Sequence, residues 1–127
     1  MTLLIFGTRT FDDIPLLEAT LKQARENTKE VVSGGANGAD HLGELWAIGY
    51  SIPLTRFPAD WDKYGKGAGP KRNQQMLEHL LVSDKPYAVC FWDGESRGTR
   101  DMLNRLRGKV KTWVVQYDQS PPKKYKL

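Results

Sequence analysis

The chain has 127 residues, a length that accommodates one domain and leaves no room for two ordinary ones. Apolar residues make up 39% of it and charged residues 27%. Disordered chains contain fewer apolar residues, so this composition excludes a disordered protein. The single cysteine, Cys90, excludes an internal disulfide framework, and the net charge of +4 is compatible with nucleic acids and with small anions as partners. The first residues have neither the basic start nor the apolar stretch typical of a signal peptide, and no apolar run approaches the ~20 residues that a membrane span needs. We therefore expect a cytoplasmic protein without membrane contact.

Short apolar runs rich in β-branched or aromatic residues alternate with stretches of helical periodicity. The predicted strands are residues 3–6, 30–33, 52–57, 87–92 and 110–117. Nearly continuous apolar strands separated by helices are typical of a parallel sheet with both faces covered. We predict one α/β domain over residues 1–117, with a Rossmann-like, doubly wound sheet of five parallel strands in the order 3-2-1-4-5. Residues 118–127 are predicted to form an exposed basic tail.

The first loop, Gly7-Thr8-Arg9, directly follows the first predicted strand. Gly7 permits a sharp turn and close approach of a ligand, while Thr8 and Arg9 can donate hydrogen bonds to an anion. The alternative is a tight turn with a solvent-facing arginine. In a doubly wound sheet this loop lies at the edge where ligands bind.

The second loop connects a strand to a helix and contains three glycines and two alanines within residues 33–40. Small residues at a helix start let unpaired backbone amides and the helix dipole approach a phosphate. We expect Ser33, Gly34, Gly35 and Gly38 to contribute to such a site. Asp40 would accept hydrogen bonds from ribose hydroxyls, and its alternative role is a stabilising charge in the first helical turn. The loop matches neither the GxGxxG dinucleotide fingerprint nor the P-loop.

The loop after the fourth strand offers a second phosphate cradle where another helix begins. Its candidate ligand residues are Asp93, Ser96, Arg97, Gly98 and Thr99. The alternative is an ordinary helix N-cap. Two glycine-rich loops at one edge of a sheet favour a shared ligand.

The third connection, residues 58–73, is unusually long and is a candidate lid or binding segment. Trp61 and Tyr64 would stack on a base or seal the core beneath the loop. Arg72 and Asn73 stand at a predicted helix start, where Arg72 can pair with a phosphate.

The spacing typical of metal ligands is absent among His41, His79 and Cys90. We expect neither a metal nor a cofactor.

Together, these motifs resemble the YspA-like branch of the SLOG superfamily over residues 3 to about 117. The segments that carry the resemblance are Gly7–Arg9, Ser33–Asp40, Phe57–Trp61, Ala68–Asn73 with Met76, Phe91–Gly94 and Ser96–Arg100. The resemblance implies a Rossmann-like fold that binds nucleotides or NAD-derived and ADP-ribose-type molecules, often as a dimer or larger assembly. Members are commonly bacterial or phage-encoded, and some SLOG domains act as sensors in anti-phage signalling.

A sister family, the lysine-decarboxylase-like LOG enzymes, hydrolyses the N-glycosidic bond of nucleoside monophosphates with the glutamate of a PGGxGTxxE motif. Here the segment Gly98–Met102 is similar to the GT step of that motif but has Met102 in place of the glutamate. Arg72 lies in a segment similar to the one that holds the LOG catalytic arginine. If the chain is catalytic, Asp40 and Arg72 are the candidate catalytic residues, because an oxocarbenium-like transition state requires a nearby carboxylate.

Three functions therefore compete. The favoured hypothesis is a sensor or sequestering module that binds a nucleotide-type ligand, as a homodimer or larger homo-oligomer. The first alternative is an N-glycoside hydrolase or transferase that acts on nucleoside monophosphates. The second is a binder of single-stranded nucleic acid, which the mild positive charge permits but does not favour.

Overall fold

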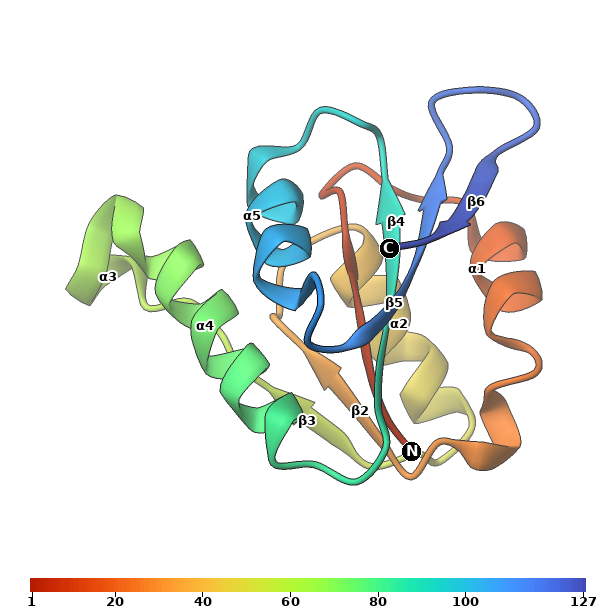
Figure 1. Ribbon diagram of the computed structural model, residues 1–127, viewed down its shortest axis with the longest axis horizontal. Helices are drawn as coiled ribbons and strands as arrows, with labels where there is room; N and C mark the ends of the chain where they lie inside the picture. The colour runs from red at the N-terminus through yellow and green to blue at the C-terminus, as the bar shows by residue number, and fades with distance from the viewer.

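A six-stranded sheet forms the centre of the molecule in the computed structural model, which describes residues 1–127 (Figure 1). The strand order is β3-β2-β1-β4-β5-β6. The strands are β1 (Thr2–Gly7), β2 (Glu30–Ser33), β3 (Leu54–Arg56), β4 (Pro86–Trp92), β5 (Lys111–Gln116) and β6 (Lys123–Lys126). The first five are parallel, in the predicted order, so the carboxyl ends of all five lie at one edge of the sheet.

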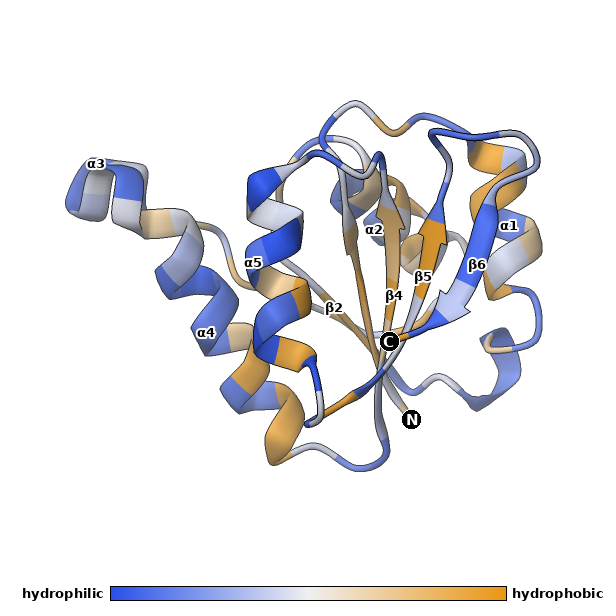
Figure 2. Cartoon of the chain, turned by 45° about the horizontal axis from the view of Figure 1, so that its top comes forward, coloured by the Kyte–Doolittle hydropathy of each residue, from blue (hydrophilic) through white to orange (hydrophobic).

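Four longer helices cover the two faces of the sheet. They are α1 (Ile14–Leu21), α2 (Ala39–Gly49), α4 (Ala68–Leu81) and α5 (Arg97–Leu106), and shorter turns are η1 (Arg25–Asn27), α3 (Trp61–Tyr64) and η2 (Gly65–Gly67). Alternate residues of β1 point to opposite faces: Leu3 packs in the cluster under α1 and α2, and Leu4 in the cluster under α4 and α5. Strand β4 is hydrophobic over much of its length and β5 in its second half only, whereas the outer surface of α5 and β6 are hydrophilic (Figure 2).

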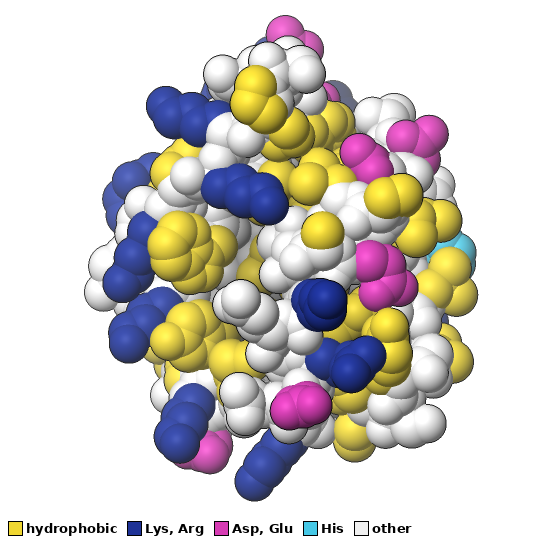
Figure 3. Space-filling model, turned by 90° about the vertical axis from the view of Figure 1, so that its right-hand side faces the viewer, with side chains coloured by type: hydrophobic (Ala, Val, Ile, Leu, Met, Phe, Trp, Pro, Cys, Tyr) yellow, Lys and Arg dark blue, Asp and Glu magenta, His cyan; other side chains and the backbone are white.

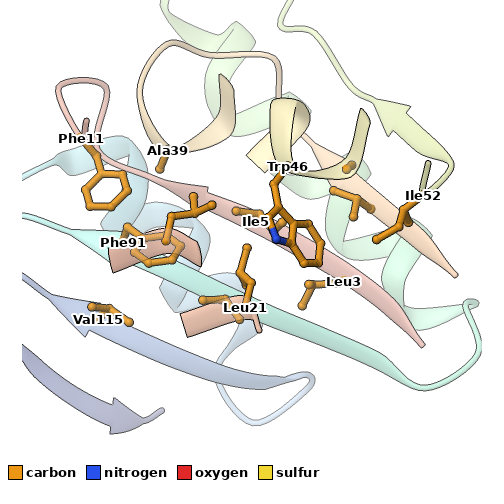
Figure 4. Packing of buried hydrophobic residues seen from close by; sticks show 13 residues of the cluster. Leu3, Ile5, Phe11, Leu21, Ala39, Trp46, Ile52, Phe91 and Val115 are labelled. Atoms are coloured by element: carbon orange, nitrogen blue, oxygen red, sulfur yellow. The ribbon is translucent and has the colours of Figure 1, made fainter. Parts of the chain in front are cut away.

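The core under α1 and α2 also anchors the first loop (Figure 4). Phe11 stacks on Phe91 of β4, with ring centroids 4.7 Å apart. Trp46 of α2 packs over the strands in the same cluster. A Cβ at Gly43 would lie 2.6 Å from Ile5, so α2 approaches β1 more closely than a side chain there allows. This packing sets the start of α2 beside the end of β1.

The sixth strand corrects the prediction of five strands. β6 pairs antiparallel with β5, from Trp113 opposite Lys126 to Gln116 opposite Lys123, and it comes from the segment that was expected to be an exposed tail. Its sequence, Lys123-Lys124-Tyr125-Lys126, lacks an apolar pattern: all three lysines are exposed and only Tyr125 is partly buried. Backbone pairing with the free edge of β5 therefore forms the strand, and its lysines stay exposed.

The long third connection is shorter in the structure than the sequence suggests. Residues 58–60 lead into α3 and η2, and α4 begins at Ala68, so Arg72 and Asn73 lie in its second turn.

None of the helices combines the length and apolar character required to cross a membrane.

Candidate functional site

A cavity of about 390 Å³ opens at the carboxyl ends of β1 and β4, where the strand order changes direction. The starts of α2 and α5 and the second turn of α4 surround it. Nine predicted site residues line the cavity: Gly7, Arg9, Asp40, Arg72, Asn73, Ser96, Arg97, Gly98 and Thr99. Both glycine-rich loops therefore contribute to one cavity, as expected for ligand sites in such sheets.

Arg72 reaches from α4 to the second loop. One of its terminal nitrogens donates to the carbonyl oxygen of Gly34, and its Nε donates to Oδ1 of Asn73 at 3.0 Å. These bonds fix the plane of the guanidinium and leave its other donors free for a ligand. A Cβ at Gly34 would collide with this guanidinium and lie 2.8 Å from Oδ2 of Asp40, so a side chain there would displace Arg72 from its present position.

Asp40 is the one carboxylate that lines the cavity. Its side chain is buried, with 4% of the residue exposed. Burial raises the pKa of Asp40 to about 6, although the amide of Ala36, which donates to Oδ2 at 3.3 Å, and the charge of Arg72 oppose this rise. The group can therefore hold or release a proton near neutral pH.

The start of α5 presents free hydrogen-bond donors to the cavity. Ser96 caps the helix by accepting from the amide of Thr99 at 3.4 Å. The amides of Arg97 and Gly98 have no acceptor in the protein, as is usual in a first helical turn. Asn73 donates to the carbonyl of Gly98 at 3.3 Å, which ties α4 to this turn. Unpaired amides at a helix start, beside an arginine, are the donors that bind phosphate in other proteins.

The electrostatics of the cavity favour an anion. Three arginines, Arg9, Arg72 and Arg97, line it against the single carboxylate of Asp40. Burial lowers the pKa of Arg72, and the positive charge of Arg9 adds to this, although the carboxylate of Asp40 acts in the opposite direction. Like charges held close together around one cavity are relieved when a negative group binds between them.

A second cavity of about 380 Å³ adjoins the first and shares Arg9, Ala36 and Arg72 with it. Gly34 and Gly35 also line this second cavity. Trp61 does so as well, and Cζ of Arg9 lies 5.8 Å from the centre of its ring. Tyr64 lines neither cavity; its ring centre lies 4.2 Å from Nζ of Lys71.

Four further predicted site residues, Asp93 among them, line neither cavity and support the loops instead. Thr8 accepts the amide of Asp93 at 3.0 Å, which joins the first and fourth loops. Gly38, at φ +74°, packs against the backbone of Thr8 and Arg9. Ser33 is fully buried and donates to Glu44 at 2.6 Å.

The carboxylate of Asp93 organises the turn before α5. Its Oδ1 accepts the amides of Glu95 and Ser96 at 2.9 and 2.8 Å. Partial burial raises the pKa of Asp93, but these hydrogen bonds outweigh it and hold the pKa below its ordinary value. Asp93 therefore remains ionised and shapes the loop from outside the cavity.

Sequence reasoning missed Glu44 and Arg56. Oε2 of Glu44 accepts from Ser33 and, at 3.1 Å, from Nε of Arg56. The amide of Gly35 donates to Oγ of Ser33 at 3.1 Å, so this network supports the second loop from below. The spacing of Asp40 and Glu44 by four residues on α2 was the available signal, since it places two carboxylates on one helix face.

Met102 lines the first cavity with its apolar side chain, where the LOG motif has its glutamate. The structure contains no group of three or more His, Cys, Asp or Glu side chains that could hold a metal ion.

Comparison with known proteins supports one family. The model of the YspA, cpYpsA-related SLOG family matches residues 1–64, which include the first and second loops. The chain is 31% identical over 96 residues to the Gene 61 protein of Mycobacterium phage D29, and the alignment covers 72% of this chain and 73% of that protein. No solved structure matches the chain significantly.

Proposed function

Because the chain belongs to the YspA, cpYpsA-related SLOG family, we propose that it binds a nucleotide or nucleotide-derived ligand as a sensor or sequestering module. The ligand class comprises nucleoside phosphates and NAD- or ADP-ribose-type molecules. The observation that carries the proposal is the first cavity, where three arginines and the free amides of Arg97 and Gly98 surround one carboxylate.

The proposed orientation follows from the chemistry of the walls. A phosphate lies between Arg72 and the start of α5, where charge-assisted hydrogen bonds and the helix dipole act together. The ribose lies against Asp40, whose oxygens accept hydroxyl donors. The base extends into the second cavity toward Trp61, which offers an aromatic face.

Thermal unfolding with a panel of AMP, ADP, NAD⁺ and ADP-ribose tests the proposal. A ligand at 100 times its Kd adds about 2.7 kcal/mol of stability, which raises Tm measurably. Replacing Arg72 by alanine should weaken binding of a phosphorylated ligand about ten- to a hundredfold, because a charge-assisted hydrogen bond is lost. Arg25→Ala removes an exposed arginine that lines neither cavity and serves as the matched control.

The same titrations with adenosine separate a phosphate contact from a structural role. Arg72→Ala should affect adenosine much less than AMP. Equal losses for both would show that Arg72 only supports the loops. Absence of any stabilisation by the whole panel would reject nucleotide binding.

The second candidate is hydrolysis of an N-glycosidic bond, which the buried Asp40 favours. A carboxyl group with a pKa near the working pH can act as general acid or base, and Asp40 lies beside Arg72 at the cavity. Met102 supplies no carboxylate from α5. We therefore expect binding without fast turnover. Release of free base from nucleoside monophosphates at about 1–10 s⁻¹, lost in Asp40→Asn with affinity retained, would establish the enzyme instead.

A further inference from the structure

The positive charge of the chain is concentrated in its last 31 residues. Residues 97–127 contain nine Lys and Arg against two acids, Asp101 and Asp118. Residues 1–96 contain ten Lys and Arg against thirteen acids. The mild overall charge of +4 therefore conceals a basic segment, folded as α5, β5 and β6, on a mildly acidic remainder.

This basic segment surrounds a hollow that is separate from the cavities described above. The hollow lies between α5 and β6, has a volume of about 350 Å³, and has no acidic side chain in its wall. Arg100, Arg107 and Lys126 line it, and none of them forms a salt bridge. Figure 3, which faces the β6 side of the molecule, shows Lys and Arg side chains gathered along one side of this face with apolar side chains between them.

Two aromatic rings complete the wall of the hollow. Trp92 at the end of β4 and Tyr125 of β6 pack against the core under α4 and α5 and remain partly exposed on the side of the hollow. Cζ of Arg100 lies 5.6 Å from the ring centre of Trp92, and Nζ of Lys123 lies 5.5 Å from that of Tyr125. The hydroxyl of Tyr125 donates to Gln116 at 3.3 Å, which holds the ring in place. Ordered aromatic rings among unpaired cations are the features that bind single strands, through stacked bases and contacted phosphates.

Protection of an edge strand explains only part of this surface. Lysines on β6 would discourage pairing with another chain, as they do on many edge strands. That function does not require Arg100 and Arg107, which belong to α5 and its end. Packing against the core explains the buried part of the two rings but not the part that remains exposed beside these arginines. An acidic protein would also satisfy the charges, so polyglutamate serves as the competing ligand in the test of this surface.

We propose that the surface formed by Trp92, Arg100, Arg107, Tyr125 and Lys126 is a binding site for single-stranded nucleic acid, distinct from the cavity at the glycine-rich loops. The phosphates contact the arginines and lysine, and a base stacks in the hollow. Such binding depends little on sequence and strongly on salt.

Fluorescence anisotropy with a labelled single-stranded dT20 oligonucleotide tests this site on the full chain. The double variant Arg100→Gln with Arg107→Gln should weaken binding about five- to tenfold and reduce the slope of log K against log salt by about 1.4, because two phosphate contacts are lost. Both side chains are exposed, so folding should be kept, which circular dichroism checks. Lys22→Gln with Lys29→Gln makes the same charge change at exposed positions outside the basic segment and should bind as the unmodified chain does.

Stacking is tested with Tyr125→Leu, which keeps an apolar side chain and removes the ring. This variant should lose about fivefold or more in affinity for dT20 and almost nothing for an abasic oligonucleotide of the same length. Arg72→Ala should bind dT20 normally, because Arg72 lies at the other cavity.

Four outcomes would overturn the proposal. They are no binding of dT20 at about 50 mM salt, equal loss in the arginine and lysine double variants, loss only in Arg72→Ala, and binding of polyglutamate as tight as that of dT20. The last outcome would assign the surface to an acidic protein partner. Failure of nucleotide binding in the thermal panel would leave these measurements unaffected.

Discussion

The glycines near the starts of α2 and α5, the two helices that begin at the first cavity, differ in the space around them. Before α2, a Cβ on Gly34 would displace the guanidinium of Arg72, and a Cβ on Gly38 would collide with the backbone of the first loop. At the start of α5, a Cβ on Gly98 would meet no atom within 4 Å. The glycines of α2 are therefore explained by packing within the protein, whereas Gly98 leaves open space that a ligand can fill.

The pKa values of the carboxylates in the two loops are also shifted in opposite directions. Burial raises the pKa of Asp40 to about 6, while amide hydrogen bonds, despite partial burial that acts the other way, lower the pKa of Asp93. Asp40 faces the cavity and can change its charge, and Asp93 stays ionised and shapes its loop. Two similar glycine-rich loops thus differ in their acids: Asp40 can change its protonation near neutral pH, whereas Asp93 stays ionised and holds its turn by hydrogen bonds.

The largest effect is expected at Gly38. Gly38→Ala should cost about 2–5 kcal/mol of unfolding free energy, because a residue at φ +74° is strained and its Cβ would meet the backbone of Thr8 and Arg9. Urea unfolding measures the loss. Gly108 has the same φ of +74° with nothing within 4 Å, so Gly108→Ala introduces a positive-φ alanine without a clash and should cost about 1–2 kcal/mol. Equal losses at both sites would show that the contact with the first loop is not tight.

The next effect separates the two carboxylates by pH. The pKa of Asp40 is higher in the folded than in the unfolded chain, so its contribution to stability is present below pH 4 and is lost as pH rises through about 6. Relative to Asp40→Asn, the unmodified chain should lose roughly 2–3 kcal/mol between pH 4 and 7. Urea unfolding of both proteins at four pH values measures the difference, in which the other acids cancel.

Asp93 should give the opposite sign. Its lowered pKa stabilises the fold above the unfolded pKa, and this contribution is lost as pH falls through the folded pKa. Relative to Asp93→Asn, the unmodified chain should therefore gain stability as pH rises from the acid range. A slope of the same sign for both carboxylates would contradict the contrast between the loops.

The smallest effect on stability is expected at Gly98. Gly98→Ala should raise the unfolding free energy by about 0.5 kcal/mol, because alanine is the better helix former and the methyl meets no atom. The same methyl enters the cavity and should weaken a bound nucleotide about tenfold if a phosphate approaches that amide. Gly49→Ala, in the last turn of α2 and also with open space, should stabilise similarly and leave binding unchanged. Unchanged affinity in Gly98→Ala would place the phosphate elsewhere.

Much of the fold follows from local patterns. The alternation of apolar strands and periodic helices, together with right-handed crossovers, predicts the order of the first five strands and the edge where their loops meet. The same reasoning places Arg9, Asp40, Arg72 and Gly98 together, because parallel strands end at one edge. The family match over residues 1–64 supports the Rossmann-like interpretation of this pattern.

Long-range contacts decided the rest. β6 has no apolar pattern of its own and exists because β5 offers an unpaired edge. Sequence alone does not distinguish the loop residues Ser33, Asp93 and Gly34. In the structure, Ser33 donates to Glu44, and Asp93 accepts amides of its own turn. The carbonyl of Gly34 accepts from Arg72, 38 residues further along the chain. Local sequence determines which backbone conformations are accessible. Which side chains face a cavity depends on contacts between residues far apart in the sequence. Those contacts form only when the helices pack on the sheet.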